Sequence, residues 1–148
     1  MNIEILKEFL LPTVMSIFLA YIAYQQMKTN KNKLKLDLYN KRFEIYTNAL
    51  KFYQELIGEE VSKETHLKFI NSKEASIFLF SKDIEIYKLL DEMHSKSFKV
   101  IGFKKHGKDI ACDPAVFLKS NNEMQQVLSW FNEQVPELRK KMQRYLAL

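Results

Sequence analysis

The stretch FLLPTVMSIFLAYIAY, residues 9–24, organises the rest of the chain. Its 16 residues carry no formal charge, which is typical of a membrane-spanning helix. At about 1.5 Å per residue the run reaches roughly 24 Å, short of the ~30 Å hydrocarbon core of a bilayer. We therefore expect Ile5, Leu6 and the aliphatic stems of Lys7 and Lys28 to extend the span. The alternative is a helix buried in a soluble protein or complex.

The net charge of the chain lies directly after this run. Residues 28–42 hold six basic side chains and one acidic side chain, a net charge of +5 that equals that of the whole chain. A basic segment beside an apolar run favours anionic lipid headgroups over nucleic acid as the partner. The side chains expected to contact lipid at this interface are Lys28, Lys31, Lys33, Lys35, Tyr21 and Tyr24.

The charge asymmetry also predicts an orientation. The flank before the run is nearly neutral, with Glu4, Lys7 and Glu8. Positively charged flanks are retained on the cytoplasmic side of a membrane. We therefore expect a single-pass protein of the inner (cytoplasmic) membrane, with its N-terminus outside and its C-terminal domain in the cytoplasm.

Small residues recur on one side of the expected membrane helix. Their spacings of three, four and three place them on one face, which consists of Thr13, Ser16, Ala20 and Ala23. Small residues let helix backbones approach closely in lipid. This face predicts a homo-oligomer or pairing with another membrane helix. The run contains no ionisable side chain, which argues against an ion path through this helix alone.

Composition indicates a mostly helical chain. Among 148 residues there are only three glycines and three prolines, and runs of β-branched residues are few. Cys112 is the single cysteine, so neither an intramolecular disulfide nor a multi-cysteine zinc site can form within one chain. This cysteine usage suits a reducing cytoplasm.

Residues 34–57 show the clearest helical period. Two neighbouring apolar stripes run along this segment: Tyr39, Phe43, Tyr46, Leu50, Tyr53 and Ile57 form one, and Leu38, Ile45, Ala49, Phe52 and Leu56 the other. Aromatic residues at helical spacing are more often core than ligand-binding surface. Arg42 interrupts the second stripe, and we expect it to pair with an acid of a neighbouring helix or with a lipid phosphate. Gly58 predicts the end of the helix.

The middle of the chain predicts two further helices. A shorter helix is expected over residues 59–70, with Asn71 or Ser72 capping the next one. The apolar stripe of that next helix consists of Ile77, Phe80, Ile84, Tyr87, Leu90 and Met93, with Phe98 and Ile101 after a longer step. Residues 102–113 are expected to form a loop. Its cluster of Lys104, Lys105, His106 and Lys108 could bind phosphate or an acidic partner, and a solvated loop is the favoured interpretation.

The last segment predicts a long amphipathic helix. Asp113 followed by Pro114 is typical of a helix start. From about residue 122 to 146 one apolar stripe contains Met124, Leu128, Phe131, Val135, Leu138, Met142 and Tyr145. Pro136 lies inside this segment and is expected to kink or split the helix near Val135.

Catalytic and metal-binding patterns are sparse. Asp91 and His94 are three residues apart on an expected helix, and His66 is elsewhere, which is less than a full metal-ligand set. Cys112 with His106 suggests a nucleophile and base, although lone cysteines are common in loops. We predict no catalytic residue, metal or cofactor from these residues.

Three segments carry a resemblance. LDLYNKRFEIY (36–46), FLFSKDIEIYKLLDE (78–92) and WFNEQVPELRKKMQRYL (130–146) resemble a loose group of small, uncharacterised bacterial membrane-anchored helical proteins. Some proteins of this general build act in phage defence, including as effectors of retrons. The resemblance implies a membrane-acting effector and transfers no functional residue.

These features together predict an all-α protein. We expect a transmembrane anchor at 1–28, a basic juxtamembrane segment and helix start at 29–42, and a small antiparallel helical bundle in the cytoplasm at 43–148. The anchor either continues or hinges into the bundle near residues 29–32. The leading functional hypothesis is a membrane-anchored interaction module with a cytoplasmic protein partner. The alternative is a membrane-tethered enzyme or the anchoring subunit of an enzyme complex.

Overall fold

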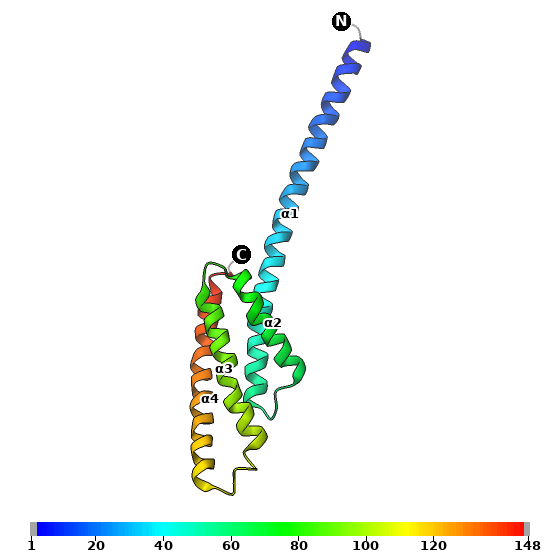
Figure 1. The fold of residues 1–148 in the computed structure, drawn as a ribbon. Coiled ribbons are helices and arrows are strands. Elements are labelled where there is room, and N and C mark those ends of the chain that lie inside the picture. The colour runs from blue at the N-terminus through cyan, green and yellow to red at the C-terminus, as the bar shows by residue number, and fades with distance from the viewer. Residues whose placement is uncertain (1–2, 147–148) are drawn as a thin grey trace. The chain divides into compact units, whose positions relative to one another are not determined.

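The computed structural model describes the backbone of residues 3–146 and the side chains of residues 9–146. Over this range the chain forms helices and turns without a strand. The helices are α1 (Ile3–Ile57), α2 (Lys63–Leu79), α3 (Ile84–His106) and α4 (Pro114–Gln143) (Figure 1). The predicted all-α class is confirmed.

The first helix is unbroken over 55 residues. It runs through residues 29–32 without a break in the helix, and it ends one residue before Gly58 as expected. The chain divides into two compact units, Met1–Leu38 and Tyr39–Leu148, and α1 contributes to both. The sequence-based division at residues 28 and 42 stays a prediction.

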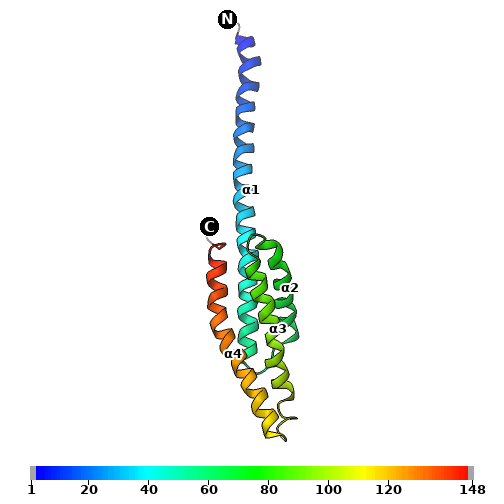
Figure 2. The same cartoon turned by 60° about the vertical axis from the view of Figure 1, so that its left-hand side comes forward.

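The core of the unit 39–148 is built from all four helices. The second stripe of α1 supplies Ile45, Ala49, Phe52 and Leu56, whereas Phe43 and Ile57 of the first stripe are exposed. Phe52 stacks on Phe69 of α2 with ring centroids 4.2 Å apart. Helix α3 packs against both α2 and α4 (Figures 1 and 2). The remaining core side chains are Phe80, Ile86, Leu89, Leu90, Met93, Val100, Met124, Val127, Phe131, Val135, Leu138 and Met142.

Helix α2 is longer than predicted and starts later. Ser62 caps it by accepting a hydrogen bond from the Thr65 amide, and the helix passes through Asn71 and Ser72 without a break. The predicted cap at these two residues is wrong. Ser72 is buried and accepts a hydrogen bond from the Asn48 side chain of α1 at 2.9 Å, so its hydroxyl binds a neighbouring helix.

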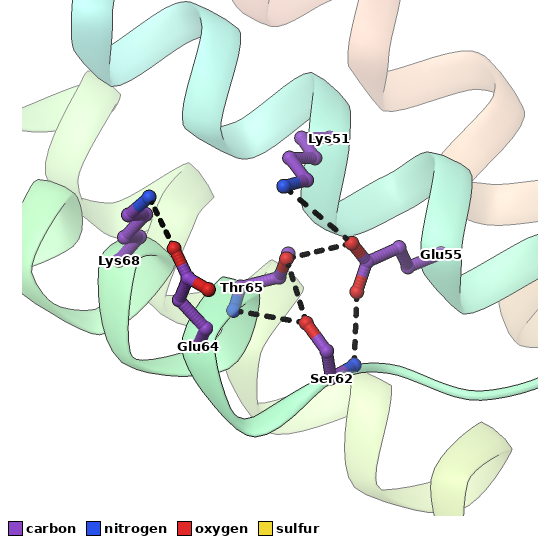
Figure 3. A network of polar contacts seen from close by, with 6 residues as sticks. All are labelled: Lys51, Glu55, Ser62, Glu64, Thr65 and Lys68. Atoms are coloured by element: carbon purple, nitrogen blue, oxygen red, sulfur yellow. Dashed lines mark hydrogen bonds and ion pairs between the residues drawn. The ribbon is translucent and has the colours of Figure 1, made fainter.

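A network of polar contacts ties the start of α2 to the end of α1 (Figure 3). The Glu55 carboxylate accepts hydrogen bonds from the Thr65 hydroxyl at 2.7 Å and from the Ser62 amide at 2.9 Å. These donors hold the pKa of Glu55 below its usual value. The network fixes the turn between the two helices. Lys51 lies 3.9 Å from the same carboxylate.

The turn between α2 and α3 divides the stripe that was predicted to cross it. The Phe80 amide bonds to the Ser76 carbonyl and the Asp83 amide to the Phe80 carbonyl, which ends α2 before α3 begins at Ile84. The turn resets the helical phase. Ile84 is therefore exposed, and the buried stripe of α3 starts at Ile86.

The loop after α3 is shorter than predicted. Helix α3 continues to His106, so residues 102–106 are helical and only residues 107–113 connect to α4. A Cβ at Gly102 would meet nothing within 4 Å. Gly102 therefore occupies an ordinary helical position with room for a side chain, and it gives no reason for the helix to stop.

Helix α4 begins as predicted and then continues without interruption. The Asp113 carboxylate accepts hydrogen bonds from the amides of Ala115 and Val116 at 3.0 and 3.2 Å, and Pro114 occupies the first turn. The helix passes through Pro136, so the alternative of a split is wrong, while the alternative of a kink stays a prediction. Pro136 leaves the Asn132 carbonyl without its helical donor. Both residues are exposed, which allows water to replace that donor.

Candidate functional site

The apolar run of α1 is exposed along its length except at Ile22, which is half-buried. Its large apolar side chains, together with the Met27 that follows, are Phe9, Leu10, Leu11, Val14, Met15, Ile17, Phe18, Leu19, Tyr21 and Tyr24, and all are exposed. No residue of the most apolar window of α1 is buried. Lipid or another protein is therefore needed to cover this surface.

By length and composition, α1 could cross a membrane. It is the one helix of the described residues with this property. Length and composition alone do not separate a membrane span from a long helix of a soluble protein.

The hydroxyls within the apolar run are satisfied by the helix itself. Thr13 donates to the carbonyl of Phe9 at 2.6 Å, and Ser16 donates to the carbonyl of Pro12 at 2.7 Å. A hydroxyl bonded to its own backbone carries less cost in an apolar environment than a free one. Thr13, Ser16, Ala20 and Ala23 are all exposed. These small side chains would let the backbone of a partner helix approach closely, and their hydroxyls are already bonded within α1.

The predicted lipid-contacting residues are also exposed. Lys28, Lys31, Lys33 and Lys35 have no carboxylate within ion-pair distance among the described side chains. Tyr21 accepts a hydrogen bond from Gln25 at 2.9 Å, and Tyr24 is exposed. The four ammonium groups are thus available to an anionic surface.

Arg42 binds main-chain carbonyls, and the alternative of a lipid phosphate stays a prediction. Its guanidinium donates to the carbonyls of Leu79 at 3.1 Å and Tyr145 at 3.3 Å. It also lies over the rings of Phe80 and Tyr145, 5.6 and 5.3 Å from their centroids. The predicted acidic partner is wrong because main-chain carbonyls at the ends of α2 and α4 take the donors. Arg42 therefore connects α1 to the C-terminal ends of α2 and α4.

His66 and His94 are brought together, although 28 residues separate them in sequence. Their Nε2 atoms lie 3.0 Å apart. Asp91, which shares the helix of His94, instead binds Lys73 at 2.8 Å. Among the described residues no group of three or more His, Cys, Asp or Glu side chains is placed to hold a metal ion. The structure thus assembles two of the three residues that the sequence singled out.

The suggested pair of Cys112 and His106 is not formed. His106 Nδ1 faces the Asp109 carboxylate at 3.3 Å, and the Cys112 thiol donates to the Asp109 carbonyl at 3.4 Å. Both residues are exposed. The histidine is therefore oriented by Asp109 and not by the thiol.

Lys104 has a structural role that the sequence did not reveal. Its ammonium group donates to the carbonyls of Leu56, at 2.7 Å, and Gly58 at the end of α1. Burial lowers the pKa of Lys104. The unsatisfied carbonyls that end every helix are the general signal for such a donor, but the sequence does not say which lysine reaches them.

Comparisons of the chain with protein-family models, with curated proteins and with solved structures found no match.

Proposed function

We propose that the chain is a membrane-anchored helical interaction module. The observation that carries this proposal is the uncharged run of residues 9–24, exposed except at the half-buried Ile22. It is followed by a basic segment whose side chains have no acidic partner among the described residues. An exposed apolar surface of this length requires an apolar environment. A bilayer with anionic headgroups supplies that environment and a counter-charge for the lysines.

The module would cross the inner membrane once, with its N-terminus outside and its C-terminal domain in the cytoplasm. The nearly neutral flank before the run and the basic segment after it support this orientation. In this proposal the cytoplasmic part is an antiparallel helical bundle. The packing of α3 against both α2 and α4 supports the bundle.

A cytoplasmic protein is the partner that we propose for the helical unit. Apolar side chains remain exposed there, among them Phe78 with 80 % of its surface accessible and Leu118 with 58 %. Outside residues 28–42 the formal charges balance. A balanced surface with exposed apolar groups favours a protein partner over nucleic acid.

The sequence resemblance refines the proposal to a membrane-acting effector of bacterial phage defence. In that form, triggering of the helical unit would cluster the membrane helices. Expression of the chain in a bacterial host with a membrane-potential dye tests the refinement. Depolarisation that requires residues 9–24 supports an effector. No depolarisation upon phage infection or overexpression contradicts this refinement and leaves the anchored module standing.

Membrane insertion itself is tested by placing a charge in the run. Ile17→Lys puts an ammonium group near the centre of the apolar segment, at a side chain that is 66 % exposed. Lysine there costs about 3–4 kcal/mol relative to isoleucine during insertion. We expect the variant to move from the membrane pellet to the alkaline carbonate supernatant.

Leu34→Lys is the matched control. Leu34 is 70 % exposed on the same helix, but it lies within the basic segment. The control should stay in the membrane pellet. Extraction of the unaltered chain by carbonate, or equal behaviour of the two variants, would contradict a membrane anchor.

A further inference from the structure

Two of the chain's three histidines lie against each other in the unit 39–148. His66 of α2 and His94 of α3 have their Nε2 atoms 3.0 Å apart, with ring planes inclined at 64°. Two imidazoles at this distance share one proton between their facing nitrogens, since one must donate and the other accept. The third histidine, His106, faces Asp109 in a separate place.

Aromatic side chains pack against the imidazole rings of His66 and His94. Phe98 lies 5.0 Å from His94 and 5.9 Å from His66, measured between ring centroids. Phe52 lies 5.5 Å from His66, and Phe69 lies 6.1 Å from His94. Both histidines are partly buried. Packing on these rings keeps the two nitrogens directed at each other, so little conformational freedom is left to lose when a ligand binds.

The charged groups beside the pair favour a neutral histidine and a bound cation. Lys73 lies 2.8 Å from the Asp91 carboxylate and 3.1 Å from that of Glu74, which leaves the three groups with one net negative charge. Burial lowers the pKa of His94, and the charges of Lys73 and His66 act in the same direction, whereas Asp91 and Glu74 oppose them. Neutral imidazole is the form that binds metal ions.

We propose that His66 and His94 together bind a divalent transition-metal ion of the zinc type through their Nε2 atoms. Two Zn–N bonds of about 2.0–2.1 Å at a tetrahedral angle place the nitrogens roughly 3.3–3.4 Å apart. The observed separation is 3.0 Å, so the rings must move slightly apart and turn until the lone pairs of both Nε2 atoms point at the ion. Imidazole nitrogen is a preferred ligand of Zn²⁺, Cu²⁺ and Ni²⁺.

Water would complete the coordination of the ion. The described residues place no third protein ligand beside the two histidines, because the Asp91 carboxylate is engaged by Lys73. The positions that water occupies can accept a further ligand, as the open position of a catalytic zinc site does. The inference does not depend on the membrane anchor, and its failure leaves the proposed function untouched.

The experiment is a calorimetric titration of ZnCl₂ into the purified full-length chain in detergent. The variants His66→Asn and His94→Asn each remove one ligand, and His106→Asn is the matched control. We expect saturable binding by the unaltered chain and by the control. Loss of a second-shell group weakens metal sites ~10–100-fold, so loss of a ligand should cost at least as much. Cys112→Ser should bind as the unaltered chain does.

A second measurement on the unaltered chain covers the case in which a ligand variant unfolds. Protons compete with metal for imidazole, so acidification from about pH 7.5 to about pH 5.5 should weaken zinc binding strongly. Circular dichroism at both pH values verifies that the chain stays folded. The proposal is overturned by absence of saturable binding, by binding that acidification leaves unchanged, or by loss of binding in the His106 or Cys112 variant.

Discussion

The His94 side chain makes the stability of the helical unit dependent on pH. Its pKa is lowered in the folded chain, chiefly by burial and then by the charges of Lys73 and His66, against the opposing carboxylates of Asp91 and Glu74. Above the ordinary histidine pKa of about 6.5, both the folded and the unfolded chain carry the neutral ring. Below it, the unfolded chain binds the proton first.

The free energy of unfolding should therefore fall as the pH decreases from about 6.5 toward the lowered pKa of His94. Chemical denaturation of the full-length chain in metal-free buffer between about pH 8 and pH 5 measures this slope. His94→Asn should flatten the slope, while His106→Asn should keep it. Equal slopes in all three chains would show that His94 does not set the pH dependence.

Arg42 concentrates several interactions in one side chain. Removing its donors leaves the carbonyls of Leu79 and Tyr145 without these partners and removes the stacking on two rings. Hydrogen bonds from a charged group are worth roughly 1.5–3 kcal/mol each, and partial exposure of Arg42 reduces that value. Arg42→Met should lower the free energy of unfolding by about 2–3 kcal/mol.

Lys41→Met is the control for this change. Lys41 is the exposed neighbour of Arg42, and the same positive charge is lost there without a described hydrogen bond. Denaturant midpoints of both variants in detergent measure the difference. A similar loss of stability in Lys41→Met would mean that the positive charge, and not the contacts of Arg42 with the two carbonyls, stabilises the helical unit.

At the scale of the element, local sequence identifies a helix cap only where the cap has no competing partner. Asp113 has the sequence pattern of a cap and is one, because its carboxylate accepts hydrogen bonds from the amides of Ala115 and Val116 and from no other described residue. Ser72 carries an equivalent local signal, yet its hydroxyl binds Asn48 on another helix. Periodicity therefore located the helices, the buried second stripe of α1 and the buried stripe of α4. It misplaced Phe43, Ile57 and Ile84, which are exposed, and the predicted cap failed where a tertiary contact engaged its side chain.

The candidate sites follow the same rule. The apolar run and its basic segment are contiguous in sequence, so their residues could be named without a structure. His66 and His94 lie on different helices, and no local period relates them. Their contact depends on the way α2 packs against α3, which only the fold provides.

The cap of α4 gives a quantitative test at this scale. Asp113→Ala removes the acceptor for two amides at the start of the helix and should lower the free energy of unfolding by about 0.5–2 kcal/mol. Asp109→Ala is the control from the same loop, where the carboxylate meets only the exposed His106. An exposed pair of this kind contributes about 0–1 kcal/mol. Thermal unfolding of both variants measures which of them loses more stability. An equal loss in the two variants would contradict a capping role for Asp113.

The small-residue face of α1 predicts how the helix associates. Ala20→Ile adds bulk where close approach is expected and should shift crosslinked oligomers toward the monomer. Phe18 precedes Ala20 by two residues, about 200° around the helix, so Phe18→Trp adds bulk on the other side. Crosslinking in membranes followed by gel analysis measures both. An unchanged oligomer pattern in Ala20→Ile, or the same shift in Phe18→Trp, would exclude association through this face.

At the scale of the whole molecule, charge and apolar surface are segregated along the chain. The net charge of +5 resides in residues 28–42, and the uninterrupted apolar surface resides in residues 9–24. The unit 39–148 buries a core of its own. This segregation suits a chain whose two parts occupy different environments, one apolar and one aqueous.

The orientation of the chain can be measured with its single cysteine. Cys112 is exposed and lies after the basic segment, so a membrane-impermeant maleimide should label it only once the inner membrane is opened. In a Cys112→Ser background, Glu4→Cys places the thiol before the apolar run and should be labelled in spheroplasts with an intact inner membrane. The positive-inside asymmetry predicts this pair of results because six basic side chains follow the run. Labelling of Cys112 alone in intact spheroplasts would indicate the opposite orientation. Labelling of both thiols there would mean that the run does not separate two compartments.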